Sequence, residues 1–88
     1  MIRGVTKTGF EFEVDEKAAD NMELVDALAG VEENDPLALS RACLLLLGKT
    51  LRGRLYDHVR DENGRVPIEA ASQELVDILG AFGQQGKT

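Results

Sequence analysis

Apolar and polar residues alternate along the opening of the chain. Phe10, Phe12 and Val14 are separated by single acidic residues, which is the period-2 pattern of a strand with one buried face. The Thr-Gly pair before Phe10 can turn the chain, so residues 2–6 are predicted to form the first strand of an antiparallel hairpin whose register the sequence leaves open. Because a two-stranded hairpin is barely stable alone, its apolar face is expected to pack on helices.

Helical periodicity replaces this alternation after the hairpin. Apolar residues recur at helical spacing and predict a first helix over about residues 20–31. The following segment, NDPLALSRACLLLLG, begins with Asp35 as an N-cap, carries a proline in its first turn and ends on Gly48 as a C-cap. It predicts a second helix over about residues 36–47.

Two more short helices are predicted in the C-terminal half. The third carries Leu51, Leu55 and Val59 on one stripe. Gly53 lies within it and weakens it by about 1 kcal/mol relative to alanine. The turn DENG ends this helix, and Pro67 starts a fourth helix with a regular apolar face.

The chain length of 88 residues suits a single small domain. Residues 1–82 are predicted to form one compact, mainly helical domain with a small β part, and residues 83–88 a flexible tail. Because so short a chain buries a small core, a partner or a second copy could supply part of its stability. The single Cys43, the lack of a signal peptide and the shortness of the longest apolar run predict a cytoplasmic protein that does not enter a membrane.

Charge is unevenly distributed along the chain. The net charge of −6 argues against nucleic-acid binding, which needs a basic face to neutralise phosphates. Residues 11–35 carry ten acidic side chains and one basic side chain, whereas lysine and arginine cluster within residues 49–65. This polarity is typical of a solvated surface pattern or, alternatively, of a docking surface for a charged partner.

Residues 59–70 imitate part of a calcium-binding loop. Asp61, Asn63 and Gly64 lie at the offsets that such a loop requires, but Val59 and Ala70 occupy its two terminal ligand positions. Too few oxygen ligands remain to offset the dehydration of a divalent cation. The segment is therefore interpreted as a tight turn in which glycine supplies a positive φ.

Other chemical motifs are incomplete. The two GKT triplets lack the glycine spacing and strand context of a phosphate-binding loop. A single His58 and a single Cys43 cannot supply the ligands of a zinc site. Ser40 follows a leucine within a helix and lacks the aspartate that precedes the attachment serine of acyl carriers. We assign no catalytic, metal-binding or cofactor-binding residue, and do not predict an enzyme.

The second helix is apolar around most of its circumference, at about 100° per residue. It is either packed on all sides or leaves an apolar strip for a partner. Leu44 lies beside Ser40 and Arg41 on the least apolar side and is expected to reach solvent, whereas Leu46 on the opposite side is expected to be buried. The candidate partner-binding residues, on this helix and the basic flank of the third, are Leu37, Arg41, Leu44, Arg52 and Arg54.

Three segments of the chain resemble, in this order, the tail assembly chaperones of long-tailed phages and prophages: TGFEFEVDEKAADNMELVDALA, NDPLALSRACLLLLG and HVRDENGRVPIEAASQELVDIL. The resemblance covers about residues 6–79 and rests on the order of the segments. It implies a protein of the bacterial host cytoplasm that binds the tape-measure protein and keeps it soluble until the tail tube polymerises around it. Gly53 departs from the good helix former expected there.

Two classes of function follow from these observations. The first is a chaperone for the tape-measure protein or another long helical protein, which lays its apolar face on the leucines. The second is a non-catalytic adaptor or regulatory domain in which the same leucines form a homo-oligomer interface. Gene order distinguishes them, because a tail-tube gene before and a long helical reading frame after would favour the chaperone.

Overall fold

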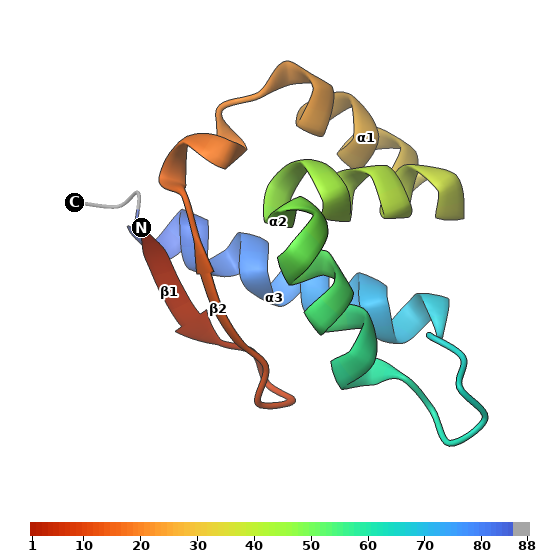
Figure 1. The fold of residues 1–88 in the computed structure, drawn as a ribbon. Coiled ribbons are helices and arrows are strands. Elements are labelled where there is room, and N and C mark those ends of the chain that lie inside the picture. The colour runs from red at the N-terminus through yellow and green to blue at the C-terminus, as the bar shows by residue number, and fades with distance from the viewer. Residues whose placement is uncertain (86–88) are drawn as a thin grey trace.

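The chain begins with an antiparallel hairpin in the computed structural model, which describes residues 1–85 (Figure 1). Strand β1 (Ile2–Val5) pairs with β2 (Glu11–Val14), in a register that sets Ile2 opposite Val14. The hairpin predicted from the alternating pattern is confirmed, and its inner face carries buried apolar side chains.

The hairpin turn uses the predicted Thr-Gly pair. The N–H of Gly9 donates to the carbonyl of Thr6 at 2.9 Å, and the N–H of Thr6 donates to the carbonyl of Phe10 at 2.9 Å. Gly9 has φ +92°, a conformation that glycine adopts without steric cost. The turn therefore closes on local backbone bonds at the residues that the sequence indicates.

Helices make up most of the rest of the described chain. A short 3-10 helix, η1 (Glu16–Ala19), leads into α1 (Met22–Glu32). The bounds of α1 agree to within two residues with those of the first predicted helix. The second helix, α2 (Pro36–Val59), begins at the predicted cap, where the Asp35 side chain accepts the N–H of Leu37 at 3.0 Å. The last helix is α3 (Ile68–Gln85).

Within residues 1–85 the structure has three α-helices, so the expected count of four is wrong. The segments predicted as a second and a third helix are two arms of α2, joined at Gly48. Gly48 has φ 79° and ψ 168°, values open to glycine but strained for other residues. One residue in this conformation redirects the chain, and the helix resumes at once without a loop, so α2 is sharply bent (Figure 1).

The start of α3 follows the predicted helix junction. The turn before it has Gly64 at φ +83°, as expected for a tight turn, and the carbonyl of Pro67 accepts the N–H of Ala71 at 3.1 Å. The helix continues beyond the expected domain boundary at residue 82 to Gln85. Residues 86–88 of the predicted tail lie outside the described residues.

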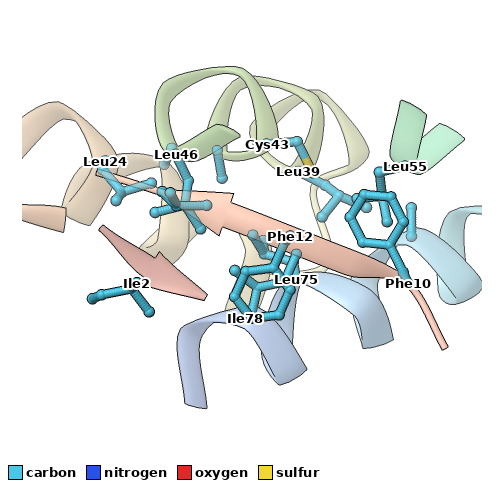
Figure 2. Close-up of a cluster of buried hydrophobic side chains, with 14 residues drawn as sticks. Ile2, Phe10, Phe12, Leu24, Leu39, Cys43, Leu46, Leu55, Leu75 and Ile78 are labelled. Carbon is cyan, nitrogen blue, oxygen red and sulfur yellow. The ribbon is translucent and has the colours of Figure 1, made fainter. Parts of the chain in front are cut away.

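The core lies between the inner face of the hairpin and the helices (Figure 2). Helix α1 packs chiefly on α2, while α3 contacts both α2 and β1. No helix within residues 1–85 combines the length and apolarity needed to cross a membrane. The buried apolar side chains are Ile2, Phe10, Phe12, Val14, Leu24, Ala27, Leu39, Ala42, Cys43, Leu46, Leu55, Ala71, Leu75 and Ile78.

Gly53→Ala is expected to raise the free energy of unfolding by about 0.5–1 kcal/mol, because alanine stabilises a helix interior relative to glycine. Gly53 is exposed in the second arm of α2, and an added Cβ would meet no atom within 4 Å. Thermal unfolding followed by circular dichroism measures the change. Gly48→Ala is the matched control and is expected to destabilise by about 1–3 kcal/mol, because its φ is positive. A fall in melting temperature for Gly53→Ala would contradict this placement.

Candidate functional site

The first arm of α2 exposes two leucines on its outer side. Leu37 is 80 % exposed and Leu44 is 40 % exposed, whereas Leu46 is 2 % exposed. Leu44 therefore reaches solvent and Leu46 is buried, as their helical positions predict. We call the exposed row formed by Leu37, Ser40, Arg41 and Leu44 the α2 outer stripe. Leu37 and Leu44 are each three or four residues from Ser40 and from Arg41, so the four lie on one side of the helix.

One arginine belongs to the α2 outer stripe and a second lies beside it. Arg41 belongs to it and extends toward α1, where its Nη2 lies 3.4 Å from Oε2 of Glu23. Both side chains are well exposed, so this ion pair contributes little to stability. Arg52 comes from the second arm, and its Nη1 donates to the Ser40 carbonyl at 3.4 Å. Its guanidinium also lies 5.6 Å from the centroid of the Tyr56 ring, within cation–π range.

Arg54 lies apart from the other predicted partner-binding residues. It lines shallow depressions beside the hairpin, together with residues such as Glu11 and Phe12. Arg52 and Arg54 are two residues apart and thus point about 200° apart around the helix axis. The structure therefore brings Leu37, Arg41, Leu44 and Arg52 together and places Arg54 on the side that faces the hairpin.

A groove of about 460 Å³ opens at the start of α2. Its walls come from the end of α1, the junction before α2 and the first turns of α3. These three segments lie at the same end of the molecule (Figure 1). The sequence did not reveal this groove, because residues 31–39 and 68–73 meet only in the folded chain. Its lining residues are Val31, Asn34, Asp35, Pro36, Leu39, Ile68, Glu69, Ser72 and Gln73.

A buried carboxylate connects α3 to the hairpin turn. Glu74 is 1 % exposed, and its two oxygens accept hydrogen bonds from the hydroxyls of Thr6 and Thr8, each at 2.7 Å. The Thr8 hydroxyl also lies 2.9 Å from Nε2 of His58. The carboxylate contacts the hydroxyls and not the imidazole, so the cluster lacks the acid–base–nucleophile order of a catalytic triad. Its evident effect is to hold the hairpin turn on the helices.

The single cysteine is fully buried on the inner side of α2. Burial raises the pKa of the Cys43 thiol to about 11, and the nearby positive charge of Arg52 opposes this only in part. The thiol therefore stays protonated at neutral pH, and a protonated thiol is a poor nucleophile. Cys43 acts here as a small apolar core residue.

In the turn that imitates a calcium loop, the aspartate side chain is hydrogen-bonded to the backbone of the turn itself. Oδ1 of Asp61 accepts the N–H groups of Asn63 and Arg65 at 2.9 and 3.0 Å. Gly64 closes the turn by donating its N–H to the carbonyl of Asp61 at 3.0 Å. Within residues 1–85, no three or more histidine, cysteine or acidic side chains are grouped so that they could hold a metal ion.

Millimolar calcium is expected to leave the melting temperature unchanged. A ligand stabilises a protein only as far as it binds the folded state, and Val59 and Ala70 supply no side-chain oxygen at the ends of this loop. Thermal unfolding with and without calcium, with magnesium as the control cation, measures the effect. A calcium-specific rise in melting temperature would overturn the interpretation of the segment as a simple turn.

No family model matches the chain, and no curated protein or solved structure shows significant similarity to it.

Proposed function

We propose that this protein binds amphipathic helical segments of a longer protein through the α2 outer stripe. The observation that carries the proposal is the exposure of Leu37 and Leu44 on a helix whose other leucines are mostly buried or half-buried. Exposed apolar surface in a small domain marks an interaction site when it gathers on one face. A row of side chains with helical spacing suits the apolar stripe of another helix.

The proposed partner is the tape-measure protein of a phage or prophage tail. The order of the hairpin, leucine-rich helix and final helix supports this choice through the resemblance to tail assembly chaperones. A small interface of two leucines and two arginines also fits a chaperone, which must release its partner as the tail tube forms. Arg41 and Arg52 would meet acidic residues on the partner and tune the rate and salt dependence of association. No catalytic step is needed in this role, which would be performed in the bacterial host cytoplasm.

Co-expression tests the proposal. Where a tail-tube gene precedes this gene and a long helical reading frame follows it, the long protein would be expressed with and without this protein. We expect the long protein to be mainly insoluble alone and to form a soluble complex when the two are produced together. An unchanged soluble fraction would contradict the chaperone function.

Self-association is the competing function for the same residues. Sedimentation of the isolated protein over a range of concentrations distinguishes the two. If wild type forms a stable homo-oligomer that Leu44→Asp converts to monomers, and the long protein does not bind, the leucines form a homo-oligomer interface and the chaperone proposal is wrong.

A further inference from the structure

The groove and the α2 outer stripe lie on adjoining sides of the first turns of α2 and differ in charge. Pro36 and Leu39 line the groove, whereas the stripe lies on the neighbouring side of the same turns. Two exposed carboxylates, Asp35 and Glu69, stand on the lining of the groove, whose apolar part includes Ile68 at 62 % exposure. The stripe, in contrast, is accompanied by arginines.

The separation between the two charges matches a short helical segment. Asp35 and Arg41 are six residues apart, which corresponds to about 9 Å along a helix axis. Asp35 at the groove and Arg41 at the stripe thus lie within the length that two turns of a partner helix would cover. A partner of a single charge sign would meet repulsion at one end of this surface.

We infer that the bound segment is an amphipathic helix with opposite charges at its two ends. At one end of the partner helix, a lysine or arginine lies beside the groove, and an apolar side chain of the partner enters it. Apolar residues in the middle of the partner cover Leu37 and Leu44, and an acidic residue at its other end contacts Arg41 and Arg52. This inference rests on the proposed function, since it assigns the chemistry and the direction of a helix that binds there.

The two groove carboxylates also have structural roles. Asp35 caps α2, and Glu69 stands in the first turn of α3, where a negative charge is favourable. Both side chains are nevertheless exposed, so each can face a cation on a partner without losing its helix. Because Asp35→Asn would disturb the cap, the test varies Glu69 instead.

The probe is a synthetic helical peptide with a leucine stripe, lysines at one end and glutamates at the other, carrying a nitroxide label at the lysine end. Paramagnetic broadening of methyl resonances in the isotope-labelled protein reports where that end lies. We expect stronger broadening at Ile68 and Val31 of the groove than at Leu44. With the label moved to the glutamate end, the stronger broadening is expected at Leu44.

Charge substitutions test the same assignment by a second measurement. Glu69→Lys is expected to weaken binding of this peptide about threefold to fivefold, the scale of an exposed charge pair, and Glu69→Gln by less. Thr50→Lys, at an exposed position elsewhere on α2, is the control for net charge and is expected to change binding little. Thermal unfolding of each variant shows that the fold is intact.

The outcomes separate this inference from the proposed function. If the peptide binds with equal broadening at both ends of the surface, or with its lysine end at Leu44, the assigned direction is wrong while helix binding stands. If neither this peptide nor its charge-uniform relatives bind at all, the proposed function itself fails.

Discussion

Leu46→Asp is expected to unfold the domain, whereas Leu44→Asp should leave it folded. Leu46 lies in the core and is only 2 % exposed, so the substitution would bury a carboxylate without a charged or hydrogen-bonding partner. The cost of several kcal/mol is comparable to the whole stability of a small domain, about 5–15 kcal/mol. Leu44 is 40 % exposed, and its replacement is expected to change the free energy of unfolding by less than about 1 kcal/mol.

Urea unfolding and circular dichroism of the two variants measure this difference. The pair is a matched control, because the same substitution is made two residues apart on one helix. A folded Leu46→Asp variant with the stability of wild type would show that the two sides of α2 are wrongly assigned, and so would an unfolded Leu44→Asp variant.

Gly30→Ala is expected to destabilise the protein by about 1–3 kcal/mol, the cost of overpacking a close contact. An added Cβ at Gly30 would lie 2.5 Å from Cβ of Ala38, where α1 crosses α2. The sign is diagnostic, since alanine normally stabilises a helix interior relative to glycine. Ala38→Gly in the same chain should restore part of the lost stability by removing the opposing methyl group.

The double-mutant comparison by chemical unfolding tests this contact. Ala38→Gly alone is expected to be destabilising through helix propensity, so the rescue appears as a favourable coupling between the two substitutions. Additive effects, or a stabilising Gly30→Ala, would show that α1 and α2 do not approach closely at this point.

Local signals in the sequence account for most of the elements. The alternation around Phe12 predicted the hairpin, and Asp35 with its following proline predicted the start of α2, because strand faces and helix caps depend on neighbouring residues. Gly48 was predicted as the C-cap that ends a helix; its φ is positive, as for many such caps, but α2 resumes after it. Whether a loop or a second helical arm follows such a glycine depends on contacts between the arms, such as Arg52 with Ser40, which the local pattern does not contain.

The candidate site was predictable only in part. The exposure of Leu44 follows from the few polar residues on α2, which mark its outer side. The groove depends on residues of α3 that reach the start of α2 only in the fold. Likewise, the local sequence of α3 does not reveal the partners of the buried Glu74 carboxylate, because they are the hydroxyls of a hairpin turn far away in the sequence.

The central claim is that Leu37 and Leu44 bind a helical partner while contributing little to the fold. The most direct measurement is the amount of soluble complex formed when the long helical protein proposed as the partner is co-expressed with wild type or with Leu37→Asp/Leu44→Asp. The melting temperature of each isolated protein is measured in parallel. We predict loss of most of the complex with a melting temperature within a few degrees of wild type, the shift expected from a change of about 1 kcal/mol. An undiminished complex from a folded double variant would contradict the account.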